Sequence, residues 1–183
     1  MGLDMYLTKK IYIGGNYEWN KVEGVVDIKK DNKQIPIDLS KVTYIDEQVA
    51  YWRKANAIHK WFVDNVQEGN DNCQSYYVSK DKLKQLLRLC KEVKKIAILK
   101  EGDVKAGATF KNGEFVQEYT KGKIIENAEE VAKILPTTDG FFFGSTDYDE
   151  YYLQDIDYTI EVLESLSKDL LDLNVEFEYR ASW

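Results

Sequence analysis

Alternation of hydrophobic and polar residues predicts strands near both ends of the chain. Residues 3–13 ("LDMYLTKKIYI") alternate imperfectly and are rich in residues that favour strands. Two shorter runs, 24–30 and 34–39, flank a polar turn. The run "VEFEYRASW" (175–183) alternates strictly and places its valine, phenylalanine and tyrosine on one face. These segments are expected to form a sheet with one buried face.

Helical periodicity dominates the middle of the chain. The longest predicted helix, about 46–67, contains "YWRKANAIHKWF" and stops before a Gly-Asn-Asp-Asn turn. A second helix spans about 79–102, with Ser79 as a favourable N-cap. The segment "NAEEVAKIL" predicts a short helix that ends at Pro136.

Between the second and third helices, about 103–121, the sequence predicts a β-hairpin insertion. Here "ATFKNGEFVQ" holds Asn112-Gly113 between two strand-like runs, the dipeptide that tight hairpin turns favour. The predicted order is strands, two helices, hairpin, two helices and a strand. Because strands and helices are grouped rather than alternating, we predict a single α+β domain over 1–183, with a mainly antiparallel sheet and about four helices.

The first candidate site lies on the longest predicted helix. At 100° per residue its large apolar side chains share one arc, and His59, the only histidine, falls within it. Asn56 lies at the edge and Arg53 just beyond, beside Tyr51 and Trp52. A stacking ring, an amide and a cation suit a nucleotide-like ligand. Two interpretations stay open: a pocket wall, or a core in which the histidine and asparagine are hydrogen-bonded.

The second candidate site is the Gly-Ser-Thr turn in "GFFFGSTDYDE". Gly144 and Ser145 precede a predicted helix, where free backbone N–H groups can bind an anion. Tyr148 follows closely and could complete the wall. We therefore predict that this turn forms the second side of a ligand pocket.

Acidic residues at the same place support two other interpretations. Asp147 is a suitable N-cap for a fourth helix over about 147–173, with Glu150 as its capping-box partner. These carboxylates suit the helix dipole and would repel a phosphate. A divalent cation held by Asp147, Asp149 or Asp155 is the remaining alternative, since hard cations prefer oxygen ligands.

Catalytic and cofactor signatures are weak. A nucleophile–histidine pair could use only His59, with Cys73 or Ser145 as conceivable partners. The sequence contains no GxSxG, P-loop or GxGxxG motif. Cys73 and Cys90 form no CxxC motif, so free thiols are expected rather than a zinc site or a disulfide framework. We predict no cofactor and no metal.

Charge is distributed unevenly along the chain. The net charge of −7 argues against general binding to nucleic acid. Residues 146–183 hold eleven acids against two bases, whereas 79–100 hold eight bases against two acids. Two solvated faces that attract each other explain this pattern, and a basic patch for an anionic partner is the alternative.

Targeting signals are not evident in the sequence. The start, "MGLDMYLTKK", lacks the basic leader and apolar run of a signal peptide. No apolar stretch approaches the length that spans a membrane. We therefore expect a cytoplasmic protein without a membrane partner.

Several motifs resemble a family of small uncharacterised proteins of bacteria and their phages. They are "GLDMYL", "YWRKANAIHKWFV", "DNCQSYYVS", "LPTTDGFFFGSTDYDEYYLQDI" and a terminal "SW". The resemblance spans most of the chain but not residues 100–125. It brings no established catalytic mechanism. It implies a cytoplasmic, phage-borne setting, in which such proteins are suspected of countering host defence, some by sequestering nucleotide signals.

The leading hypothesis is a non-enzymatic, self-associating protein that sequesters a small anionic, nucleotide-derived ligand. The predicted ligand-binding residues come from both candidate sites: Tyr51, Trp52, Arg53, Asn56, His59, Gly144, Ser145 and Tyr148. One alternative is a nucleotide-cleaving phosphodiesterase or lyase that uses His59 as general acid/base and Arg53 to stabilise charge. Another is an inhibitor that binds a host protein through the acidic C-terminal helix.

Overall fold

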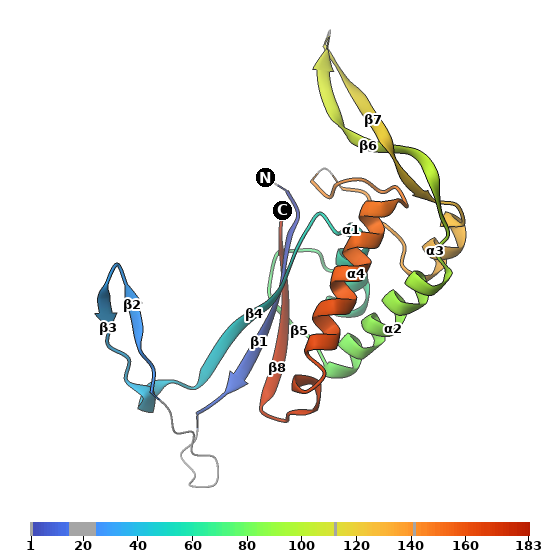
Figure 1. Cartoon of the computed structure of the whole chain (residues 1–183). Helices are drawn as coiled ribbons and strands as arrows, with labels where there is room; N and C mark the ends of the chain where they lie inside the picture. The colour runs from blue at the N-terminus through green and yellow to red at the C-terminus, as the bar shows by residue number, and fades with distance from the viewer. Residues whose placement is uncertain (1, 15–24, 112, 141) are drawn as a thin grey trace.

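The centre of the molecule is an antiparallel sheet with strand order β4-β1-β8-β5 (Figure 1). The structure is a computed structural model, and it describes residues 2–14, 25–111, 113–140 and 142–183. Gly24 of a predicted strand, Asn112 of the predicted hairpin turn and Phe141 of the GFFFGSTDYDE motif lie outside these residues. Strand β1 (Asp4–Tyr12) pairs with β4 (Tyr44–Arg53) on one side and with β8 (Val175–Ser182) on the other. The short β5 (Tyr76–Tyr77) pairs with β8. Strands from the two ends of the sequence are therefore neighbours, and the α+β class is confirmed.

One face of this sheet is buried under the helices. In β8 every second residue is buried and the residues between them are exposed or partly buried, as the sequence pattern predicts. Helices α1 (Asn56–Asn65), α2 (Lys80–Ile96) and α4 (Glu150–Ser165) contribute to the same core as the buried side chains of the sheet. Fully buried members of this core include Leu3, Met5, Leu7, Ile58, Phe62, Leu83, Leu86, Ile156 and Phe177. Tyr179 stacks on Phe62 with 3.8 Å between ring centroids.

The basic helix α2 packs against the acidic helix α4. Lys91 pairs with Glu164 at 2.7 Å and Lys94 with Asp157 at 2.5 Å. The predicted attraction between the two charged faces is thus confirmed. Ser79 caps α2 by accepting a hydrogen bond from the Lys82 amide, also as predicted. No helix within the described ranges is both long and apolar enough to span a membrane.

The prediction of one helix over about 46–67 is wrong in its first half. Residues up to Arg53 form strand β4, and α1 begins only at Asn56. Ala50 and Trp52 are buried while Tyr51 is exposed, which is the period of a strand. Pairing with β1 decides the conformation of this segment, because local propensity is weaker than a full ladder of inter-strand hydrogen bonds.

Helix α4 also starts and ends differently from the prediction. Its N-cap is Asp149, whose carboxylate accepts hydrogen bonds from the amides of Tyr151 and Tyr152. The prediction of Asp147 as the cap is therefore wrong. The helix ends at Ser165, and a separate 3-10 turn, η3 (Asp169–Leu171), follows.

Two hairpins extend from the body on different sides (Figure 1). The predicted insertion is a long ribbon of β6 (Leu99–Lys111) and β7 (Glu114–Ile125), so α2 ends earlier than predicted. The shorter hairpin joins β2 (Ile28–Lys30) to β3 (Lys33–Ile35), and η2 (Leu39–Lys41) follows it. Helix α3 (Ala128–Ile134) comes directly after β7, where the sequence predicts it.

Candidate functional site

A cleft of about 750 Å³ lies where the end of β4, the start of α1, the middle of the β6–β7 hairpin, the α3–α4 loop and α4 meet. This central cleft has the size of a small-molecule site. Its lining combines polar and charged residues with apolar surface, to which α4 contributes Tyr152 and Ile156. The polar residues used below are Arg53, Lys54, Asn56, Lys105, Gly144, Ser145, Asp147, Tyr151, Gln154 and Asp155.

Two cations stand at the end of β4 without partners. Arg53 and Lys54 line the central cleft and are exposed. Within the described part of the chain, no residue forms a hydrogen bond or ion pair with either side chain. Their charges are therefore available to an anion that enters the cleft.

Unusual backbone geometry holds Lys54 in place. Lys54 has a φ of +62°, a left-handed conformation that non-glycine residues rarely adopt, and its amide donates to the Leu3 carbonyl at 2.8 Å. Gly144 on the α3–α4 loop has a φ of +88°. A Cβ atom at position 144 would lie 3.0 Å from the Lys54 Cβ, so only glycine fits this approach without a shift. Local strain of this kind is often found at functional sites.

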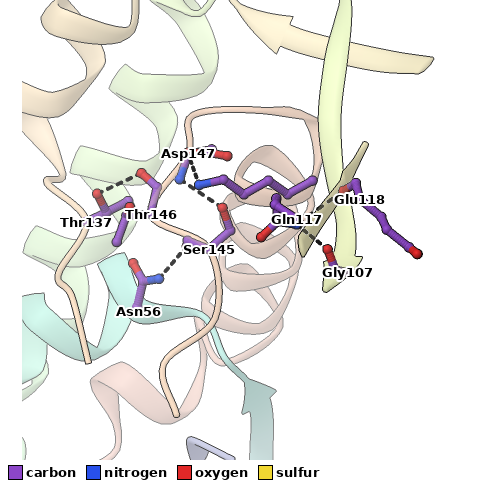
Figure 2. Close-up of polar contacts among 9 residues, drawn as sticks. Asn56, Gly107, Gln117, Glu118, Thr137, Ser145, Thr146 and Asp147 are labelled. Carbon is purple, nitrogen blue, oxygen red and sulfur yellow. Dashed lines mark hydrogen bonds and ion pairs between the residues drawn. The ribbon is translucent and has the colours of Figure 1, made fainter. Parts of the chain in front are cut away.

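Asn56 fastens the α3–α4 loop to the start of α1 (Figure 2). Its side-chain Nδ2 donates to the carbonyls of Phe143 at 3.2 Å and Ser145 at 2.6 Å. Its Oδ1 accepts from the Thr138 amide at 3.3 Å. Because both side-chain amide protons donate to loop carbonyls, Asn56 positions the loop and has no N–H group left to donate to a ligand.

The hairpin supplies another wall of the cleft. The Lys105 ammonium donates to the Asp147 carboxylate at 2.9 Å, and this hydrogen bond raises the lysine pKa. The ladder between β6 and β7 slips between Lys105 and Gly107, and irregularities of this kind redirect side chains next to binding sites. Gln117 on β7 donates to the Gly107 carbonyl across the ribbon (Figure 2). The positive charge of Lys105 is therefore balanced by Asp147, whereas Arg53 has no such partner among the described residues.

Helix α4 presents Asp155 to the cleft. This partly buried carboxyl forms no hydrogen bond or ion pair with any residue in the described ranges. Burial, with a smaller contribution from the charge of Asp149, raises the pKa of Asp155 to about 7. Burial also raises the pKa of Asp149, although two backbone amides oppose that shift. The cleft thus holds a carboxyl that changes charge near neutral pH.

His59 lies outside the central cleft, in what we call the His59 cluster: His59, Asp71, Tyr179 and Trp183. The imidazole Nδ1 is 2.8 Å from the Tyr179 hydroxyl and Nε2 is 3.0 Å from an Asp71 carboxylate oxygen. Trp183 donates its indole N–H to the other oxygen of Asp71 at 3.0 Å. A smaller cleft of about 560 Å³ adjoins the cluster, but His59 itself is 0% exposed. The structure therefore favours the core interpretation of His59.

Three other predicted residues lie away from the central cleft. Trp52 is 2% exposed and donates its indole N–H to the Thr159 hydroxyl in the core. Tyr51 is on the open face of the sheet, where its hydroxyl donates to Asp4. The Tyr148 hydroxyl accepts from the Thr137 amide at 3.0 Å and so braces the loop. Of the predicted ligand-binding set, the cleft brings together Arg53, Asn56, Gly144 and Ser145.

The structure gives no support to the other sequence-based alternatives. In the described residues, no three His, Cys, Asp or Glu side chains converge as metal ligands. Neither Cys73 nor Ser145 is a hydrogen-bond partner of His59. The Ser145 hydroxyl accepts from the Asp147 amide at 3.1 Å, and Asp149 occupies the start of α4, so this helix end is already capped.

Sequence reasoning missed several cleft residues, notably Lys54, Lys105, Tyr151 and Gln154. Lys54 is adjacent to Arg53, and treating the segment as helix hid its role. Tyr151 and Asp155 are four residues apart on α4, a spacing that could have identified a shared stripe beside the core position Ile156. No feature of the sequence could have identified Lys105, because only the folded hairpin brings it to the cleft.

Comparison with known protein families, with curated proteins and with solved structures produced no match to this chain.

Proposed function

We propose that this protein binds a small anionic, nucleotide-derived ligand in the central cleft and sequesters it without cleaving it. The observation that carries the proposal is the pair Arg53 and Lys54, two unpaired cations on the wall of a cleft of about 750 Å³. A phosphate entering there would gain charge-assisted hydrogen bonds without breaking an existing ion pair. In the proposed setting the protein is phage-borne and acts in the host cytoplasm.

The construction of the cleft supports binding. The left-handed conformation of Lys54 costs stability and is held in place by the hydrogen bond from its amide to the Leu3 carbonyl, while glycine at 144 lets the α3–α4 loop approach Lys54. Asn56 fixes the loop through three hydrogen bonds. A site that is rigid before the ligand arrives loses less conformational entropy on binding.

The position of the histidine supports sequestration over hydrolysis by the predicted acid/base pair. His59 is buried, both its ring nitrogens are engaged, and it adjoins a different cleft from Arg53. The two residues of the proposed enzyme mechanism are therefore not brought together.

One observation favours an enzyme that uses another residue. The pKa of Asp155, raised by burial to about 7, is well placed for a general acid/base at neutral pH. The second candidate function is accordingly a nucleotide-cleaving enzyme with Asp155 as its acid/base. The inhibitor acting through the acidic helix has weaker support, because Lys91 and Lys94 of α2 already pair with acids of α4.

A single assay tests these functions. The protein is incubated with a panel of nucleoside monophosphates and cyclic nucleotides, binding is measured by calorimetry, and the ligand is recovered after denaturation and identified by mass spectrometry. Intact ligand is expected. Recovery of altered ligand, abolished by Asp155→Asn, would support the enzyme instead. If no nucleotide binds, both functions fail, and capture of a host protein becomes the next experiment.

A further inference from the structure

Helix α4 turns three side chains of complementary chemistry toward the central cleft. Tyr151, Gln154 and Asp155 all line it, at the i, i+3 and i+4 spacing that places residues on one helix face. Tyr151 is 50% exposed, so much of its ring is accessible. The cleft therefore has two distinct parts: cations at the end of β4, and an aromatic ring, an amide and a carboxyl on α4.

Asp155 differs from the neighbouring acids by having no partner. Asp147 pairs with Lys105, Asp149 caps α4, and Asp157 pairs with Lys94. In the described part of the chain, no residue forms a hydrogen bond with the Asp155 carboxyl or with the side-chain amide of Gln154. A partly buried carboxyl without donors is unfavourable, and a ligand that supplies N–H groups would offset that cost.

The ligand chemistry follows from what a carboxylate accepts. Its two oxygens can take two parallel N–H bonds, as they do from arginine. Among nucleobases only guanine carries a ring N–H beside an amino group on its pairing edge. Adenine and cytosine place an amino group beside a ring acceptor, and uracil has one N–H between two carbonyls. Next to this edge guanine also has a carbonyl, which an amide such as that of Gln154 can donate to.

We propose that Tyr151, Gln154 and Asp155 form a base-recognition subsite that selects a guanine nucleotide, with its phosphate toward Arg53 and Lys54. Tyr151 supplies the stacking surface, which is tolerant of base identity. Asp155 and Gln154 supply the selection. This inference rests on the proposed nucleotide-binding function and adds which base the cleft prefers.

Calorimetry at pH 8 with five nucleoside monophosphates tests the inference. Guanosine monophosphate is expected to bind at least about tenfold more tightly than inosine monophosphate, which lacks only the amino group, and than the uridine and adenosine compounds. Asp155→Asn should remove this preference. It should also favour xanthosine monophosphate, which has a carbonyl in place of the amino group that the new amide can donate to. Asp157→Asn, on the same helix but paired with Lys94, is the matched control and should keep the preference.

Three results would overturn the inference, and they separate its failure from failure of the proposed function. Equal binding of all the monophosphates, or an unchanged preference in Asp155→Asn, rejects guanine selection while nucleotide binding by the cleft stands. Failure of every monophosphate to bind rejects the proposed function together with the inference. A circular dichroism melt of Asp155→Asn confirms that the variant is folded before its binding is interpreted.

Discussion

The central cleft and the His59 cluster are both polar regions beside aromatic side chains, yet they differ in how their polar atoms are satisfied. In the His59 cluster each imidazole nitrogen has a protein partner, and Asp71 uses both its oxygens. In the central cleft Arg53, Lys54 and Asp155 have no partner among the described residues. Polar groups that are already satisfied stabilise the fold, whereas unsatisfied charged groups are available to a ligand.

The largest expected effect is on stability, from His59→Ala. The substitution leaves a cavity and removes the partner of the Tyr179 hydroxyl and one of the two partners of Asp71, so the free energy of unfolding should fall by about 3 kcal/mol. Urea denaturation followed by tryptophan fluorescence measures it. Nucleotide affinity should be unchanged at a temperature where the variant is folded. A stable variant with lost binding would reverse the roles assigned to the two regions.

The second effect is a gain of stability from Asp155→Asn that depends on pH. The folded-state pKa is about 7 against an ordinary 3.8, so the folded chain takes up this proton first as the pH falls. The cost of the buried charge is thus fully present above pH 7 and disappears toward about pH 4. At pH 8 the asparagine variant should be more stable by about 2 kcal/mol, less than the full shift implies because the carboxyl is partly solvated.

Denaturation curves at pH 4, 6 and 8 check this prediction. Asp157→Asn, which removes an exposed carboxylate on the same helix, serves as the control and should show a much smaller change across the series. A gain for Asp155→Asn that does not depend on pH would mean that packing, and not desolvation of the carboxylate, explains it.

The third effect concerns Arg53, at the end of the central cleft where we propose that a phosphate binds. Arg53→Ala should weaken binding of a nucleoside monophosphate by about tenfold or more, because a charge-assisted hydrogen bond is lost. The melting temperature should hardly change, since the arginine side chain has no partner among the described residues. Arg88→Ala, which removes an exposed arginine from α2, is the matched control for the change in net charge. Equal losses of affinity in both variants would indicate a general charge effect and not a site.

The smallest effect distinguishes backbone strain at a glycine from the close approach of Gly144 to Lys54. Gly144→Ala and Gly69→Ala both place a side chain at a φ above +80°, but only position 144 meets another residue, the Lys54 Cβ at 3.0 Å. Both variants should lose about 1 kcal/mol of stability from the left-handed conformation. Only Gly144→Ala should also reduce nucleotide affinity, by a few-fold, because it displaces Lys54. Equal binding by the two variants would show that the contact does not matter.

Much of the fold was predictable because local patterns and tertiary structure agree. The strict alternation of 175–183, the Ser79 cap and the hairpin after α2 all have local causes that survive folding. The helix prediction failed for segment 46–55 because its apolar residues fit the periodicity of a helix as well as that of a strand. Only pairing with β1 selects the strand. The predicted cap of α4 was wrong for a similar reason. The folded hairpin places Lys105 beside Asp147, which forms an ion pair with it, and Asp149 caps the helix instead.

The sequence by itself determined the α+β class, the single histidine and the two oppositely charged helices, and it predicted four residues that line one cleft: Arg53, Asn56, Gly144 and Ser145. Only the tertiary structure decided which polar atoms would find protein partners. His59 and Asn56 were satisfied by residues far away in the chain, whereas Arg53, Lys54 and Asp155 were left without partners. The physical reason is that hydrogen bonds depend on distance and direction between segments that only the folded sheet and loops bring together.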